Sequence, residues 1–198
     1  MNKNICVFCS SGDILEAKYY ILAKNLAELI ANGKNNLVFG GSKVGMMRIL
    51  AEHIKKNNGK AIGVIPQKIY DNNLACEILD ELIITKDMHS RKSKMAKLAD
   101  AFIALPGGFG TLEELTEVIT HKQLGYHSNP VIIINLDGFY DRLIDFFEEM
   151  YSQSFAKTVY RKLYITVNSA EEAMEYIKNY KPPVLENKWF VPNPNQNL

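Results

Sequence analysis

The sequence predicts an α/β fold in which a doubly wound, mostly parallel sheet carries helices on both faces. Short apolar runs with strand character alternate with longer segments whose apolar residues recur at helical spacing, and this alternation is typical of βαβ units. Runs such as Val131-Ile132-Ile133-Ile134 are apolar on both faces, as expected of strands that helices cover on both sides. The predicted fold is therefore Rossmann-like.

Taken in order, the expected elements account for most of the chain. Strands are expected near residues 4–8, 37–40, 61–65, 82–85, 101–105, 131–135 and 164–167, and helices near 14–32, 44–57, 88–99, 111–124, 139–152 and 169–180. A chain of 198 residues suits one domain with a full-sized core, to which we assign residues 1–180. Residues 181–198 are rich in Pro and Asn and contain Trp189-Phe190; we expect an extended tail docked on the body or on a partner subunit.

Charge and hydropathy narrow the class of protein. The chain has 23 Lys and Arg against 22 Asp and Glu, and it lacks the basic stripe that nucleic-acid-binding domains carry. No apolar stretch is long enough to span a bilayer, and the first residues lead into a strand without a signal peptide. We therefore expect a cytoplasmic protein with no nucleic-acid or membrane partner.

The three cysteines are expected to be free thiols. Cys6 and Cys9 form a C-x-x-C pair, which elsewhere is a redox or metal-binding motif. Cys6, however, lies inside a strand-like run rather than at a helix N-terminus, where such thiols become reactive. No second Cys or His pair has zinc-ligand spacing, so we expect no metal and no cofactor.

The most informative stretch joins the expected fifth strand to the next helix: Pro106-Gly107-Gly108-Phe109-Gly110-Thr111-Leu112-Glu113-Glu114. Glycines let the backbone approach a ligand closely, and the first amides of a helix point outward without partners. These amides and the helix dipole favour an anion, most often phosphate. We expect the amides of residues 107–111 to bind one, assisted by Ser10 and Ser11 after the first strand. A carboxylate beside a phosphate indicates chemistry on a nucleotide or sugar phosphate.

The same stretch also matches a capping box, with Thr111 at the N-cap and Glu114 at N3. In that reading both residues only stabilise the helix, by about 1 kcal/mol. The capping role and a role in chemistry can coexist.

A second glycine turn, with Gly40, Gly41 and Gly45, follows the expected second strand. Neither turn has the spacing of a P-loop or of G-x-G-x-x-G, which weakens any nicotinamide-cofactor reading. These glycines either only make tight turns or line a ligand site. Two glycine turns at one sheet edge favour the second alternative, with Gly40 and Gly41 in the site.

Arg91 lies on the apolar face of the helix expected at 88–99, in the same arc as Met88 and Met95. A guanidinium there needs a partner to offset its desolvation. It either snorkels or pairs with a structural acid, or it is aimed at a carboxylate or a ligand phosphate.

These motifs resemble one protein family, the LOG ("Lonely Guy") cytokinin riboside 5′-monophosphate phosphoribohydrolases, many of which were once labelled lysine decarboxylases. The resemblance implies a Rossmann-like homodimer that hydrolyses the N-glycosidic bond of an N6-modified AMP to free base and ribose 5-phosphate. It rests on Asp87-Met88-His89-x-Arg91-Lys92, Pro106-Gly107-Gly108-x-Gly110-Thr111-x-x-Glu114, Gln123-Leu124-Gly125 and Asp137-Gly138-Phe139-Tyr140.

The resemblance assigns catalysis to Arg91 and Glu114. It implies nucleotide contacts from Arg91, Lys92, Gly107, Gly108, Phe109, Gly110, Thr111, Leu112, Glu113 and Thr120. Some positions depart from the family pattern. Ser42 and Arg48 stand where members often have glycine, and ungapped counting places Asn73 where a Glu often contacts the base or ribose, whereas Glu77 would require a shift.

Three rival functions remain open. A general nucleotide N-glycosidase would share every motif and differ in base preference. A non-catalytic carrier or sensor of a nucleotide-like ligand would need the glycine turn but not the carboxylate. Amino-acid decarboxylation would need a pyridoxal-phosphate lysine, and no lysine lies in a recognisable context for one.

Overall fold

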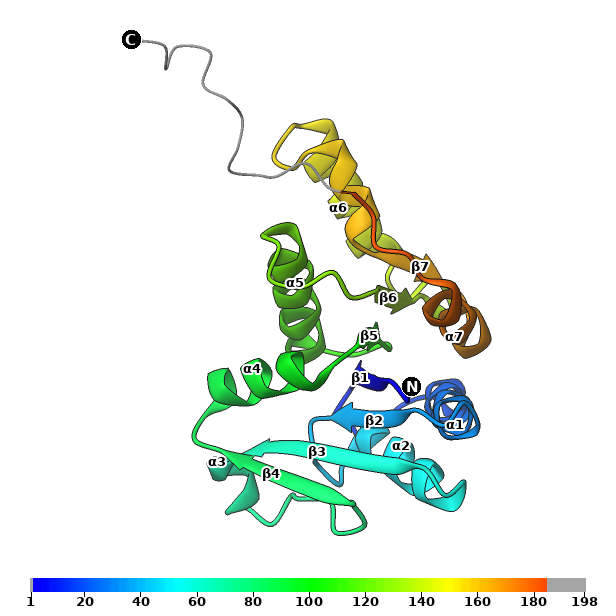
Figure 1. The fold of residues 1–198 in the computed structure, drawn as a ribbon, viewed down its shortest axis with the longest axis vertical. Helices are drawn as coiled ribbons and strands as arrows, with labels where there is room; N and C mark the ends of the chain where they lie inside the picture. The colour runs from blue at the N-terminus through cyan, green and yellow to red at the C-terminus, as the bar shows by residue number, and fades with distance from the viewer. Residues whose placement is uncertain (1, 185–198) are drawn as a thin grey trace.

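The structure, a computed structural model, describes residues 2–184 of the chain. At its centre is a seven-stranded sheet in the order β4-β3-β2-β1-β5-β6-β7, in which all pairings are parallel (Figure 1). The strands are β1 (Asn4–Phe8), β2 (Asn36–Phe39), β3 (Lys60–Pro66), β4 (Glu81–Thr85), β5 (Ala101–Ala104), β6 (Val131–Ile134) and β7 (Ile165–Val167).

Helices cover both faces of this sheet (Figure 1). One buried apolar cluster joins the sheet to α1 (Ala17–Asn32), α2 (Gly45–Lys56) and α7 (Ala170–Asn179). The other joins its opposite face to α4 (Met88–Leu98), α5 (Phe109–Gln123), α6 (Asp141–Ser152) and the 3-10 helix η2 (Thr158–Leu163). The predicted α/β, doubly wound class is therefore confirmed.

The seven predicted strands and six predicted helices are all present, with ends that move by a few residues. α1 begins at Ala17 rather than near residue 14, because the preceding loop folds over α2 instead. Three short elements were not predicted: α3 (Gln67–Tyr70), η1 (Leu136–Gly138) and η2. They are too short to show a periodic apolar pattern.

Residues 181–184 have no regular secondary structure, and the rest of the expected tail, with Trp189 and Phe190, lies outside the described residues. The division into a domain of residues 1–180 and a tail stays a prediction. Within residues 2–184, no helix has both the length and the apolar character that crossing a bilayer requires.

The loop after β1 closes the N-terminus of α2. The Gly45 amide donates to the Asp13 carboxylate at 2.8 Å, and the Met46 amide donates to the Ser10 carbonyl at 3.1 Å. Gly45 has a φ of 55°, and a Cβ there would lie 2.7 Å from the Ser10 carbonyl oxygen. The chain itself therefore occupies the first amides of α2.

Gly45→Ala is expected to destabilise the protein more than Gly125→Ala. Gly125 also has a positive φ, of 81°, but nothing lies within 4 Å of a Cβ there. Both variants meet the left-handed backbone cost of about 1 kcal/mol. Only Gly45→Ala also collides with packed backbone, which adds about 1–3 kcal/mol. Urea unfolding measures both, and equal losses would contradict the close contact.

Candidate active site

A cavity of about 280 Å³ opens at the carboxyl ends of β1 and β5. These neighbouring strands mark the point where the strand order reverses, and ligands of open α/β sheets bind in the crevice there. The cavity is lined by Val7, Phe8, Cys9, Ser10, Ser11, Gly40, Met47, Ile69, Met88, Arg91, Met95, Gly108, Phe109, Gly110, Thr111 and Glu114.

The predicted glycine turn forms the polar end of this cavity. Gly108 is the N-cap of α5, no side chain caps this end, and the first helical hydrogen bond runs from the Leu112 amide to the Gly108 carbonyl at 3.0 Å. A Cβ at Gly108 or Gly110 would meet nothing within 4 Å. Amides that a side chain does not cap, beside open space at a helix N-terminus, suit an anion.

The capping-box interpretation is wrong. α5 begins at Phe109, two residues before the predicted start, and Thr111 therefore lies inside the helix rather than at its N-cap. Its side chain is buried and lines the cavity. Glu114 is likewise not a cap, because its carboxylate points to another helix.

That carboxylate is the partner of Arg91. Arg91 Nη1 donates to Glu114 Oε1 at 2.9 Å, and Arg91 Nε donates to the Val64 carbonyl at 3.0 Å. The Arg91 and Glu114 side chains are only 11% and 8% exposed. The expected partner for the buried guanidinium is thus found, and snorkelling is excluded. The pair joins α4 to α5 across the cavity wall.

Burial sets the proton affinity of this pair. Desolvation raises the pKa of Glu114 above its ordinary value, and the Arg91 charge only partly offsets it. Burial, with a smaller contribution from the Glu114 charge, also raises the pKa of Cys9, so that its thiol stays protonated at neutral pH. The three cysteines are free, as predicted.

Several predicted contact residues lie outside the cavity lining. Lys92 forms ion pairs with Glu113 and with Glu117, the second at 3.2 Å, along the outer faces of α4 and α5. Leu112 is half-buried, and Thr120 is exposed with its hydroxyl donating to the Thr116 carbonyl at 2.8 Å.

The glycines of the two turns have different structural roles. Gly40 lines the cavity, and a Cβ there would overlap the Arg91 guanidinium. Gly41 lies outside the lining, has a φ of 71°, and packs so that a Cβ would lie 3.2 Å from the Gly63 Cα. Gly107 is also outside the lining, and a Cβ there would overlap the Thr111 side chain.

Ser42, one of the departures from the family pattern, fixes the neighbouring loop. Its hydroxyl donates to the Leu74 carbonyl at 2.9 Å, and the Lys43 amide donates to the same carbonyl. Neither Asn73 nor Glu77 lines the cavity; both are exposed, and Glu77 pairs with Lys43 at 3.4 Å.

Sequence reasoning did not foresee that the apolar side chains of Met47, Ile69, Met88 and Met95 line the cavity, with the Met88 sulfur 4.0 Å from Arg91 Nη1. The sequence places Met88 and Met95 on the apolar face of their helix, and in the structure both line the cavity. Met47 comes from α2 and Ile69 from the unpredicted α3. Only the tertiary fold brings these elements together.

Fold and cavity define a Rossmann-like α/β protein with open helix amides and a buried carboxylate at its switch point. A family model described as "possible lysine decarboxylase" matches residues 47–177. Cytokinin riboside 5′-monophosphate phosphoribohydrolase LOG5 of Arabidopsis thaliana is 37% identical over 193 residues, covering 96% of this chain and 85% of the relative. The probable enzyme LOGL3 of Oryza sativa subsp. japonica is 40% identical, covering 91% and 85%. The chain belongs to this family, the LOG family.

Solved structures share the fold. The molybdenum cofactor binding protein of Rippkaea orientalis superposes with a TM-score of 0.68 at 26% identity, covering 90% of this chain and 96% of that one. The molybdenum cofactor carrier protein of Chlamydomonas reinhardtii gives 0.69 at 21% identity, covering 90% and 97%. The second likeness is one of fold alone.

Arg91→Met is expected to lower the free energy of unfolding by about 3–5 kcal/mol at pH 7, because Glu114 is then buried without a counter-charge. Its pKa rises further, so the folded variant holds a proton that the unfolded chain has lost. Stability therefore falls as pH rises from the ordinary glutamate value of 4.5 and is greatest below it. Urea unfolding from pH 4 to 8 measures this.

Lys92→Met is the matched control. Lys92 pairs with Glu113 and Glu117, which are 55% and 23% exposed, so that both acids remain accessible to water and the loss of Lys92 should cost about 1 kcal/mol. An Arg91→Met loss that is equal at pH 4 and pH 8 would contradict the assignment of the effect to Glu114.

Proposed function

We propose that this protein hydrolyses the N-glycosidic bond of an N6-modified adenosine 5′-monophosphate, which releases the free base and ribose 5-phosphate. The observation that carries the proposal is the Arg91–Glu114 pair, buried beside the open amides of the glycine turn. Relatives that are 37–40% identical over nearly the whole chain bear the name of this cytokinin-activating reaction.

In the proposed mechanism Glu114 acts on the anomeric carbon. Breaking the bond from C1′ to the base nitrogen develops positive charge on the ribose, which a nearby carboxylate stabilises as base for water or as nucleophile. In the net reaction the water oxygen bonds to C1′, and one water proton goes to the base nitrogen. Arg91 holds Glu114 ionised and oriented, since its charge opposes the effect of burial.

The cavity lining combines polar groups with apolar side chains, which suits a nucleotide. Amides at the start of α5, in residues 108–111, together with Ser10 and Ser11, take the 5′-phosphate, and this binding energy orients the ribose against Glu114. The base then lies toward Met47, Ile69 and Met88. Methionine side chains adapt to irregular apolar shapes, which suits an aliphatic substituent on N6.

The rival readings differ in what they ask of the cavity. A general nucleosidase needs the same polar end but no preference for an apolar N6 group. A carrier, as the structural relatives are named, has no use for a buried carboxylate paired with Arg91. Decarboxylation through pyridoxal phosphate needs a lysine, and among the described residues none lines the cavity.

Glu114→Gln is expected to lower kcat at least about 100-fold, because it removes the carboxylate that stabilises the transition state. Chromatography of free base from N6-isopentenyl-AMP and from AMP measures this, with a melting curve for each protein. Glu148→Gln, which alters an exposed glutamate–arginine pair with Arg161 outside the cavity lining, is the control and should keep its activity. We expect N6-isopentenyl-AMP to be preferred.

Other results of this experiment would each favour a different function or remove Glu114 from the mechanism. Equal turnover of AMP would favour the general nucleosidase, and full activity of Glu114→Gln would remove Glu114 from the chemistry. Release of base from neither nucleotide by the wild type would favour the carrier.

We also propose that the enzyme is a cytoplasmic homodimer. Free thiols suit a reducing compartment. Phe109 and Met88, at the cavity rim, are 92% and 44% exposed, and large exposed apolar groups are typical of interfaces. The family implies a nucleotide contact from Thr120, which lies outside the cavity of its own chain. A second copy supplies that contact if its α5 reaches the cavity.

The dimer should elute at twice 22.4 kDa in size-exclusion chromatography with light scattering. If Thr120 serves the partner's cavity, Thr120→Arg should lose activity, and mixing it with Glu114→Gln should restore part of it. The mixed dimer has one cavity with both Glu114 and Thr120 intact. A fully active monomer, or a fully active Thr120→Arg variant, would contradict the shared site.

A further inference from the structure

A buried tyrosine holds the base of the glycine turn. Tyr140 is 5% exposed, and its hydroxyl donates to the Leu105 carbonyl at 2.7 Å. Burial raises the pKa of the phenol, and the Gly107 backbone, which faces the same oxygen, has a smaller and opposite effect on that pKa. The hydroxyl therefore holds the backbone just before Pro106 and lies against the backbone just after it, at the point where β5 ends and the turn begins.

Tyr140 is itself fixed by the turn after β6. Its amide donates to the Asn135 side-chain carbonyl at 2.6 Å, and the Asn135 amide group donates to Asp141 at 2.7 Å. Gly138 has a φ of 76°, and a Cβ there would lie 2.5 Å from the Asp141 carboxylate. The turn cannot shift without breaking these contacts, so Tyr140 has a defined position.

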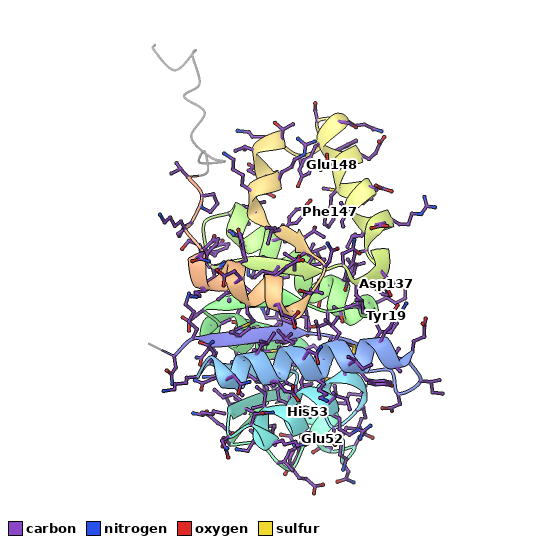
Figure 2. The ribbon with its side chains drawn as sticks, turned by 90° about the vertical axis from the view of Figure 1, so that its right-hand side faces the viewer. Tyr19, Glu52, His53, Asp137, Phe147 and Glu148 are labelled. Carbon is purple, nitrogen blue, oxygen red and sulfur yellow. The ribbon has the colours of Figure 1, made fainter. Side chains whose placement is uncertain are left out.

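The turn is also anchored to α1. Lys18 pairs with Asp137 at 3.1 Å, and the Tyr19 and Phe139 rings meet edge to face at 5.9 Å. Figure 2 shows Tyr19 and Asp137 next to each other at one end of α1. Tyr140 thus connects a rigid part of the fold, on the far side of the sheet, to the turn that begins α5.

We propose that Tyr140 is a positioning residue, whose hydroxyl sets the Leu105–Gly107 backbone so that the α5 amides face the substrate phosphate. The inference rests on the phosphate site of the proposed function. The Asp137-Gly138-Phe139-Tyr140 motif then serves the reaction through the glycine turn, because Tyr140 is not among the residues that line the cavity.

The test compares Tyr140→Phe with a matched loss of a buried hydroxyl. Tyr160 is 4% exposed, and its hydroxyl is the buried side-chain polar atom without a hydrogen-bond partner in the part of the chain that the structure describes. Tyr140→Phe should raise KM for the nucleotide and the inhibition constant of ribose 5-phosphate about tenfold, since the Leu105 carbonyl loses its partner. Its kcat should fall by a smaller factor than KM rises, because Arg91 and Glu114 are unchanged and only the orientation that phosphate binding gives the ribose is weakened.

Amide hydrogen exchange gives a readout that does not depend on activity. Residues 105–112 should exchange faster in Tyr140→Phe than in the wild type, while Tyr160→Phe should match the wild type in exchange, KM and inhibition constant. If Tyr140→Phe does not fold, Asn135→Ala keeps the hydroxyl but loosens its turn, and it should raise the same constants by a smaller factor.

Gly110→Asp separates this inference from the phosphate site. Its carboxylate would stand in the open space beside the α5 amides and should repel ribose 5-phosphate. Weaker inhibition in Gly110→Asp with none of the expected change in Tyr140→Phe would overturn the role of Tyr140 and leave the phosphate site standing. Unchanged inhibition in both would overturn the phosphate site itself.

Discussion

The buried ion pair of Arg91 and Glu114 is the interaction on which the site depends. α4 follows the edge strand β4, and α5 follows the interior strand β5. The pair joins these two helices at 2.9 Å, and Arg91 also donates a hydrogen bond to β3. A buried pair contributes little stability compared with apolar residues of the same volume, yet breaking it is costly. Its value is therefore better explained by what it does to Glu114: the Arg91 charge lowers the pKa of a carboxyl group whose pKa burial raises, and so partly offsets that burial.

The glycine positions are explained by side-chain packing in the cavity wall as much as by a ligand. Gly40 leaves room for the guanidinium, and Gly107 leaves room for the buried Thr111. Only Gly108 and Gly110 of these four face open space at the start of α5. A glycine-rich sequence thus combines two requirements, close packing behind the cavity wall and free backbone in front of it, and an alanine at each position would test which one applies.

Periodicity in the sequence was enough to predict the strands of the sheet and the longer helices, because long apolar patterns indicate which residues are buried. It misplaced the start of α5, since Gly108, Phe109 and Gly110 have the composition of a loop. The Thr111-x-x-Glu114 pattern fits a capping box or a site equally well, and only the helix start decides between them. The position of Arg91 on an apolar helix face indicated that it needs a partner. The helix pattern did not identify that partner, because Glu114 lies 23 residues away in sequence. The sequence pattern could not predict Ile69 as a cavity residue, because it belongs to a helix of only four residues.

Groups that follow β4 and β6, on either side of β5 in the strand order and on one face of the sheet, converge on one turn, and this ties stability to activity. Arg91 approaches α5 from the β4 side, whereas Tyr140 approaches the preceding backbone from the β6 side. The helix N-terminus between them has no side-chain cap, so its amides are free for a ligand but contribute nothing to holding the turn. Contacts made elsewhere must hold it, and Tyr140 and the Arg91–Glu114 pair are those contacts. In a site of this kind the backbone groups that bind the ligand have no partner in the protein. Neighbouring contacts hold them in place: the Arg91–Glu114 pair in the cavity wall and Tyr140 behind it.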